Sequence, residues 1–219
     1  MNILLVVATQ PEIAPLLLKY NGSTESNGFK ISSHTIKVLI TGVGMVATAF
    51  ALGKHLALKK YDLAINAGIA GSFDFNLALG DVLIVNEDVF ADQGAENGDD
   101  FLSISEMGFG ESQQVPTILN AGSLNTYKLK QARAITVNKV HGNELSIAKV
   151  IARLNPQIES MEGAAFFYAC NNSLTPCIQI RSISNYVERR NREKWNIGLA
   201  IKNLNEALFE VLEGTPAPG

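Results

Sequence analysis

Short apolar runs that end in glycine or in a polar residue recur along the chain and alternate with segments of helical character. Ile3–Ala8 and Leu63–Asn66 have the length of buried strands, and Met45–Lys59 between them has the length of a helix. Strands that alternate with helices predict a single-domain α/β fold with a mostly parallel central sheet flanked by helices. The predicted strands are Ile3–Ala8, Phe29–Ser33, His34–Thr41, Leu63–Asn66, Gly80–Val85, Ala134–Val137 and Pro176–Ser184.

The helices and the remaining segments complete this prediction. We expect one domain over residues 1–213, a disordered Pro/Gly tail over 214–219, and a polar turn at Asn21–Asn27. The polar, glycine-bearing stretch from Ala91 to about Leu119 predicts a long loop or flap. The predicted helices are Glu12–Tyr20, Met45–Lys59, Asn143–Arg153, Ser160–Cys170 and the amphipathic segment Arg192–Glu213, which includes Trp195.

Composition excludes several classes of function. The 219 residues are 47% hydrophobic, which is enough for a large core, and a net charge of −3 argues against a nucleic-acid-binding surface. The N-terminal apolar run lacks a basic flank, and no apolar run approaches the length of a membrane span, so we expect no membrane segment. Cys170 and Cys177 lie among apolar residues, as buried thiols of a cytoplasmic protein would. The histidines are scattered, so we expect no metal site.

Two glycine segments follow predicted strands. Gly42-Val-Gly44 opens a helix and superficially fits a dinucleotide fingerprint, but Asp62 precedes the next strand instead of ending it, which disfavours that interpretation. Its backbone N–H groups suit an anion, a hydroxyl or a water. The second segment, which contains Ala70 and Gly71, is either a tight turn or a backbone wall for a flat ligand. Together the two segments predict a crevice at the carboxyl edge of the sheet.

Three polar residues stand out, and each has an ordinary alternative. Glu12 lies just after the first strand, where an acid can simply stabilise a helix start. Glu162 precedes a run of small residues that suggests tight packing, although it could face solvent. Asn185 ends a predicted strand, where asparagine is also a common turn residue. None of the three identifies a function alone.

Taken in order, these segments resemble the nucleoside phosphorylase/nucleosidase family, and within it the hydrolytic branch, over nearly the whole chain. The motifs that carry the resemblance are Glu12, Gly42-Val-Gly44, Asn66-Ala-Gly-Ile-Ala-Gly71, Gly80-Asp-Val82, Ser160-Met-Glu-Gly-Ala-Ala165 and Arg181-Ser-Ile-Ser-Asn185. The resemblance implies cleavage of an N-glycosidic bond through an oxocarbenium-like sugar. It implies a small nucleoside substrate, no cofactor, and a homodimer or larger homo-oligomer in which the 91–119 segment covers its own or a neighbour's site.

The resemblance also implies roles for individual residues. Glu12 matches the carboxylate that activates water, and Glu162 matches the residue that accepts hydrogen bonds from the ribose hydroxyls. Met161 matches the residue that packs under the sugar, and Asn185 matches the residue that meets N7 of the purine. We add Arg189 as a binding residue for a carboxylate on the substrate. Arg190 and Arg192 are alternatives for that role, and all three could instead form a solvated basic helix start.

Two departures from adenine-cleaving relatives bear on the substrate. Those relatives carry Asp at the position of Asn185 and Glu at the position of Ser160. An asparagine amide can donate to both N7 and O6, so it permits hypoxanthine without excluding adenine. The segments Ile3–Leu18, Val38–Phe50 and Leu63–Asn86 contain no Arg or Lys, which favours water over phosphate as the nucleophile, although a basic residue from elsewhere could reach the site.

Three alternatives therefore remain beside a hypoxanthine-releasing nucleosidase. They are a methylthioadenosine/S-adenosylhomocysteine-type nucleosidase, a purine nucleoside phosphorylase, and a nucleoside-binding module without catalysis.

Overall fold

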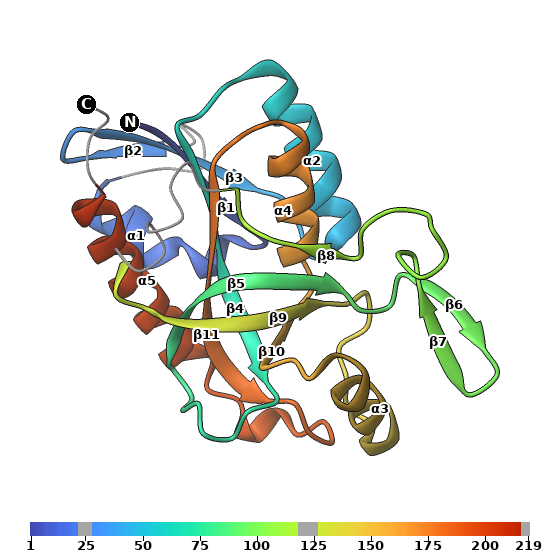
Figure 1. Ribbon diagram of the computed structural model, residues 1–219. Coiled ribbons are helices and arrows are strands. Elements are labelled where there is room, and N and C mark those ends of the chain that lie inside the picture. The colour runs from blue at the N-terminus through green and yellow to red at the C-terminus, as the bar shows by residue number, and fades with distance from the viewer. Residues whose placement is uncertain (22–27, 118–126, 216–219) are drawn as a thin grey trace.

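The computed structural model describes residues 1–21, 28–117 and 127–215 (Figure 1). The strands are β1 (Asn2–Val7), β2 (Gly28–Ile31), β3 (His34–Ile40), β4 (Leu63–Ser72), β5 (Val82–Phe90), β6 (Gly94–Asn97), β7 (Asp100–Ser103), β8 (Gln113–Gln114), β9 (Lys130–Thr136), β10 (Ile158–Ser160) and β11 (Cys177–Tyr186). The helices are α1 (Ala14–Lys19), α2 (Met45–Leu58), α3 (Glu144–Leu154), α4 (Gly163–Asn172) and α5 (Ile197–Gly214), with 3-10 turns η1 (Gln10–Glu12) and η3 (Arg192–Lys194).

One large sheet runs in the order β10-β9-β5-β11-β4-β1-β3-β2. Strand β10 also pairs with β4, so β4, β11, β5, β9 and β10 close on themselves as a small barrel from which β1, β3 and β2 extend. The pairs β1–β3, β1–β4, β4–β11 and β5–β9 are parallel, whereas β5–β11 and β2–β3 are antiparallel. The predicted α/β architecture is confirmed, with antiparallel pairs mixed into the sheet.

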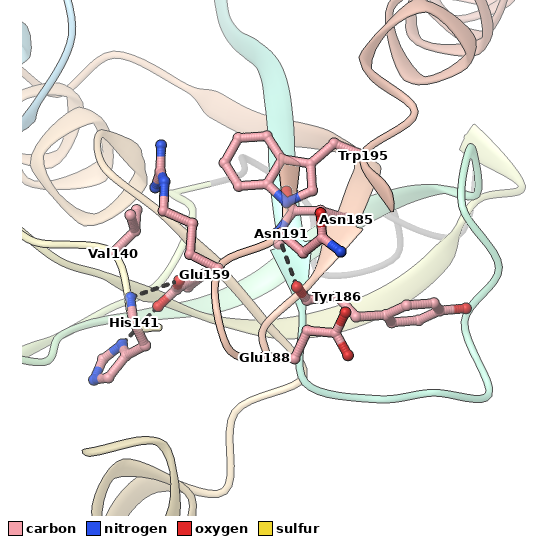
Figure 2. Close-up of a pocket in the computed structure, with 10 residues that line it drawn as sticks. Val140, His141, Glu159, Asn185, Tyr186, Glu188, Asn191 and Trp195 are labelled. Atoms are coloured by element: carbon pink, nitrogen blue, oxygen red, sulfur yellow. Dashed lines mark hydrogen bonds and ion pairs between the residues drawn. The ribbon is translucent and has the colours of Figure 1, made fainter. Parts of the chain in front are cut away.

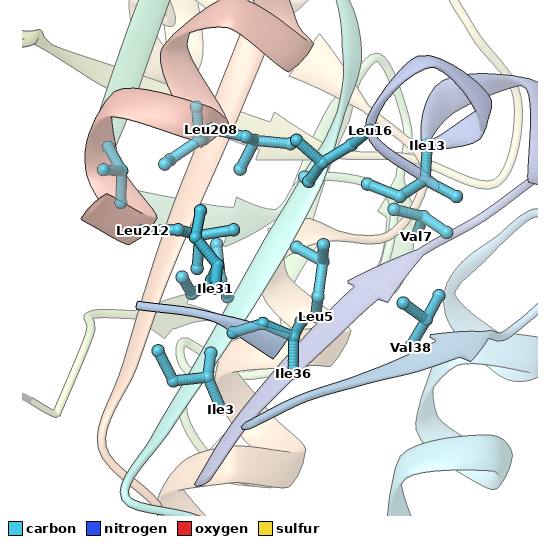
Figure 3. Packing of buried hydrophobic residues seen from close by; sticks show 14 of the residues in the cluster. Ile3, Leu5, Val7, Ile13, Leu16, Ile31, Ile36, Val38, Leu208 and Leu212 are labelled. Carbon is cyan, nitrogen blue, oxygen red and sulfur yellow. The ribbon is translucent and has the colours of Figure 1, made fainter. Parts of the chain in front are cut away.

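Helices cover both faces of the sheet, and strand β1 shows why. Successive side chains of a strand point to opposite faces, and both sets are buried here. Ile3, Leu5 and Val7 pack against α1 and α5 (Figure 3). Leu4 and Val6 belong to a second apolar cluster, shared with α2 and α4. In Figure 1, α1 and α5 lie on one side of the sheet and the packed pair α2 and α4 on the other.

Several predicted elements differ from the structure. Strand β5 runs to Phe90 and not to Val85, β9 begins at Lys130 and not at Ala134, and the helix predicted from Glu12 is divided into η1 and α1. The glycine segment Asn66–Gly71 is part of β4 and not a loop, because it pairs along its length with β11. Ser160 lies in strand β10, so α4 begins only at Gly163. Trp195 follows η3 and lies outside α5, because a turn separates η3 from the helix. The segment from Ala91 is more regular than predicted, because β6 and β7 form a hairpin that projects from the body in Figure 1.

Three predicted segments include residues that the structure does not describe. Residues 22–27 of the predicted turn, 118–119 of the predicted flap and 216–219 of the predicted tail lie outside the described residues. Of the tail, Gly214 is the last residue of α5, and Thr215 is buried, with its hydroxyl donating to the Val211 carbonyl at 2.6 Å. Within the described residues, no helix is long and apolar enough to cross a membrane.

Candidate active site

Glu12 is a buried acid on η1, at the end of β1. Its Oε2 accepts hydrogen bonds from the backbone N–H of Thr9 at 2.8 Å and from the Thr9 hydroxyl at 2.9 Å. The first of these bonds belongs to a capping box between Thr9 and Glu12. Its Oε1 accepts from the Ile69 N–H on β4 at 3.3 Å. Glu12 therefore does stabilise the start of a helical turn, as the simpler interpretation of the sequence predicted. The Oε1 atom nevertheless faces β4 and not solvent.

Glu162 lies immediately before α4 and is also buried. Its Oε1 accepts from the Gly44 N–H at 3.0 Å, and its Oε2 lies 3.5 Å from Nη1 of Arg181. Gly44 has a φ of 97°, a left-handed conformation that glycine adopts without strain. The structure thus joins the predicted Gly44 segment to the predicted ribose carboxylate. The solvent-facing alternative for Glu162 is wrong, because only 6% of the residue is exposed.

Arg181, on β11, belongs to one of the motifs that carry the family resemblance, but our sequence reasoning gave it no role. It is 1% exposed, and its Nε donates to Oε1 of Gln179 at 2.8 Å, while Nη2 donates to Asn66. A Cβ on Gly68 would overlap Nη1 of Arg181 and lie 3.0 Å from Oε1 of Glu12. Gly68 therefore leaves the space in which the guanidinium group reaches toward both acids. The only signal in the sequence was a charged residue between Ile180 and Ser182 in the predicted strand Pro176–Ser184.

A fully buried acid, Asp88, lies beneath this cluster. It accepts from the Thr136 hydroxyl at 2.8 Å and from Nε2 of Gln179 at 2.9 Å. Burial raises the pKa of Asp88 to about 6, although the bonds from Gln179 and Thr136 and the charge of Arg181 oppose the rise. The amide of Gln179 thus accepts from Arg181 on one side and donates to Asp88 on the other. This chain fixes the orientation of the guanidinium group.

Asn185 lines a small pocket beyond the end of β4. The register of β11 shifts between Ile183 and Asn185, so Ser184 forms a bulge of the kind that redirects the next side chain. The Ser184 hydroxyl donates to the Ala70 carbonyl at 3.2 Å and to Oδ1 of Asn185 at 2.8 Å. A Cβ on Gly71 would lie 3.1 Å from Nδ2 of Asn185. The predicted residues Ala70, Gly71 and Asn185 therefore come together.

The pocket encloses about 60 Å³, which is room for one edge of a flat ring and not for a whole nucleoside. Figure 2 shows Glu159 bound to His141 on one side and Asn185 with Trp195 on another. Met161 is half-buried and lies in the chain between Glu159 on β10 and Glu162 before α4.

The three candidate arginines separate in the structure. Arg189 is exposed and lines an open groove beside α3, which Arg190 lines too, but it does not line the small pocket of Asn185. Arg190 lines the small pocket, and its guanidinium group lies 4.9 Å from the ring centroid of Trp195. Arg192 lies 5.8 Å from the same ring. The geometry brings Arg190 closer to the pocket than the predicted Arg189.

The described residues contain no group of three or more His, Cys, Asp or Glu side chains that could hold a metal ion. Buried carboxylates, one arginine and backbone N–H groups make up the polar surface at the carboxyl ends of β1 and β4. Carboxylates in such surroundings can accept hydrogen bonds from hydroxyl groups and can activate water.

A fold and site of this kind define an α/β enzyme that acts on nucleosides. Residues 2–213 match the model of the Phosphorylase superfamily, and the chain belongs to that family. A futalosine hydrolase of Streptomyces coelicolor is 30% identical over 152 residues, which cover 68% of this chain and 65% of that relative, just under two thirds of its length. A 5'-methylthioadenosine/S-adenosylhomocysteine nucleosidase of Colwellia psychrerythraea is 28% identical over 207 residues, covering 82% of each.

Solved structures share the same fold. A 5'-methylthioadenosine/S-adenosylhomocysteine nucleosidase from Colwellia psychrerythraea, in complex with adenine, superposes with a TM-score of 0.82 at 22% identity, covering 98% of this chain and 95% of that chain. The predicted nucleoside phosphorylase-like fold is confirmed by the family match and by this structure. The predicted nucleosidase class is confirmed by the family match and the two relatives above. The relatives differ in the nucleoside they are named for.

Proposed function

We propose that this protein is a futalosine hydrolase, which releases hypoxanthine from futalosine in menaquinone biosynthesis and acts in the cytoplasm. The observation that carries the proposal is the amide of Asn185, which lines a pocket with room for one edge of a base. One Nδ2 proton of this amide donates to the Tyr186 carbonyl at 3.1 Å, which leaves the other for N7 or O6 of hypoxanthine. The stretch Ser182–Trp195, which includes this residue, resembles the C-terminal part of futalosine hydrolases, and the relative in Streptomyces coelicolor carries that name.

In the proposed reaction, Glu12 takes a proton from water, and the water oxygen bonds to C1′ of the sugar. The C1′–N9 bond breaks, its electron pair passes to the base, and the base takes up a proton from solvent, to which Glu12 later releases the proton it took from water. Asn185 donates a hydrogen bond that strengthens as charge moves onto the base, and it does not lose its own proton. Glu162, held by Gly44 and Arg181, accepts from the ribose hydroxyls and faces the cationic sugar.

The second candidate is cleavage of methylthioadenosine or S-adenosylhomocysteine. The likeness to nucleosidases named for these substrates favours it. Against it stand Asn185 and Ser160, where adenine-cleaving relatives carry Asp and Glu. A nucleoside-binding module without catalysis is less favoured, because such a protein has no use for a buried acid such as Glu12 in contact with β4.

A panel of nucleosides separates these functions. The purified protein is mixed with futalosine, inosine, methylthioadenosine and adenosine, with and without phosphate, and the free base and the sugar product are measured. We expect fastest release from futalosine, no dependence on phosphate, and a free reducing sugar as the product. Preference for methylthioadenosine would replace the proposal with the second candidate, and a sugar phosphate would identify a phosphorylase.

We also propose that the protein forms a homodimer or larger homo-oligomer through the face of α2 and α4. Val46 and Phe50 on α2, Tyr168 on α4 and the nearby Phe109 are all more than half exposed. A cavity of about 390 Å³ opens among α2, α4 and residues 104–111. An apolar surface of this kind is typical of a protein–protein interface. Light scattering would measure the mass, and a monomer at micromolar concentration would contradict the proposal.

A further inference from the structure

Glu159 is a buried carboxylate for which the reaction above has no use. It lies on β10, is 4% exposed, and lines the same small pocket as Asn185. Its Oε1 accepts from the His141 N–H at 3.0 Å, and its Oε2 pairs with Nδ1 of His141 at 2.7 Å (Figure 2). Each carboxylate oxygen can accept more than one hydrogen bond, so both retain capacity for a ligand.

Gly71 shows how near Glu159 and Asn185 come to each other. A Cβ at this position would lie 3.1 Å from Nδ2 of Asn185 and 3.6 Å from Cγ of Glu159. The two side chains therefore approach the same point of the backbone from either side, and the absence of a side chain on Gly71 keeps the space between them open. One Nδ2 proton of Asn185 donates to the Tyr186 carbonyl at 3.1 Å, which leaves the other for a ligand. The pocket is thus lined by an amide donor and a carboxylate acceptor.

This pairing matches one edge of a 6-oxopurine. Hypoxanthine presents acceptors at N7 and O6 and, next to O6, a donor at N1–H, whereas adenine presents a donor at its 6-amino group and an acceptor at N1. We propose that Glu159 accepts the N1–H of the base and, held in place by His141, makes the pocket select 6-oxopurines. The inference rests on the proposed function, because it assumes that Asn185 meets the same base.

The alternative is that Glu159 has only a structural role, in which its hydrogen bonds hold the loop of His141 against β10. That role would require the same two hydrogen bonds, and the loss of Glu159 would then weaken all ligands alike. Recognition of N1–H predicts something different. It predicts that the loss of Glu159 changes the ratio of dissociation constants between ligands that have this proton and ligands that lack it. The reason is that the carboxylate repels the N1 lone pair of adenine and clashes with an N-methyl group.

The experiment measures binding of free bases, which avoids any assumption about the 5′ group of the substrate. Dissociation constants of hypoxanthine, 1-methylhypoxanthine and adenine are measured by calorimetry for the parent and for Glu159→Gln. We expect the parent to prefer hypoxanthine to both others by at least about 10-fold, as a charge-assisted bond would provide. Glu159→Gln is expected to lose roughly 10-fold in hypoxanthine affinity and most of the discrimination. The control Glu206→Gln, an exposed acid on α5, should leave all constants unchanged.

The outcomes separate the inference from the proposed function. Equal binding of hypoxanthine and 1-methylhypoxanthine by the parent overturns the inference without any variant, and futalosine cleavage by that same protein leaves the proposed function standing. If Glu159→Gln loses affinity by the same factor for all three bases, the inference is also overturned, and Glu159 has only the structural role. Discrimination that depends on Glu159, in a protein that does not cleave futalosine, supports the inference and refutes the proposed function.

Discussion

The buried acid Asp88 gives a prediction whose sign and size follow from its surroundings. The change is Asp88→Asn, which keeps the shape of the side chain and removes its titration. Asp88 is fully buried, and burial raises its pKa from the ordinary value of 3.8 to about 6. Between these two values the folded protein retains a proton that the unfolded chain has released. Its contribution to stability is therefore fully present below about pH 4 and is lost as the pH rises through 6.

The magnitude follows from the same two values. Each pKa unit corresponds to about 1.4 kcal/mol, so the difference between 3.8 and about 6 amounts to about 3 kcal/mol of unfolding free energy lost by pH 7. The variant does not have this loss. It has a constant cost instead, about 1–3 kcal/mol, because an asparagine amide cannot both accept from Thr136 and accept from Gln179 on its other side.

The assay is urea unfolding of parent and variant at several pH values from 4 to 8, at constant ionic strength. Many groups contribute to the pH dependence of each protein, but the difference between the two curves isolates Asp88. We expect that difference to change by about 2–2.5 kcal/mol in favour of the variant between pH 4 and 7, because the unfolded side chain is already partly ionised at pH 4. Glu206→Gln on the exposed face of α5 should give a flat difference. Parallel curves for parent and Asp88→Asn would refute the reasoning.

The remaining predictions concern the residues that contact the substrate in the proposed reaction. Glu12→Gln should still bind futalosine while kcat falls by roughly 10² or more, and near-normal turnover would exclude it as the general base. Glu162→Ala should lower both kcat and affinity, and equal parent activity on ribo- and 2′-deoxynucleosides would contradict its role. Asn185→Asp should cut kcat/KM for the 6-oxo substrate by roughly 10- to 100-fold relative to its 6-amino analogue, and an unchanged ratio would show that the amide does not distinguish them. Arg190→Ala should weaken futalosine more than inosine, whereas Arg189→Ala should not; the reverse result would restore the original prediction.

The spacing of apolar residues and the alternation of predicted strands and helices were enough to predict the fold class. Buried strands such as β1 carry unbroken apolar runs, which are easily recognised. The end of β4 was missed for a physical reason. Gly68 and Gly71 are typical of turns, but here they are needed within a strand, where Arg181 and Asn185 approach the backbone closely. Only tertiary contacts reveal that need. Strand β10 was missed because three residues are too few to show a period.

The site was predicted in part, for a related reason. Glu12, Glu162 and Gly44 were identified through a family resemblance, and the structure brings the last two into contact. Arg181 and Asp88 were not singled out, because a single charged residue in an apolar strand has no local pattern. Their roles arise from partners far away in the chain, such as Asn66 for Arg181.

Arg181 also bears on the choice between water and phosphate. The sequence argument for water depended on the absence of basic residues near the glycine segments, and Arg181 supplies one from β11. Its guanidinium group is engaged, however, by Gln179, by Asn66 and by the carboxylate of Glu162. With Glu12 also facing β4, two carboxylates surround a single cation. An incoming phosphate dianion would have to displace Glu162 from Arg181 and remain beside both acids, whereas a neutral water meets no such repulsion. The arginine therefore favours hydrolysis, because it holds Glu162, the carboxylate that we propose binds the ribose, and is not free to bind an anion.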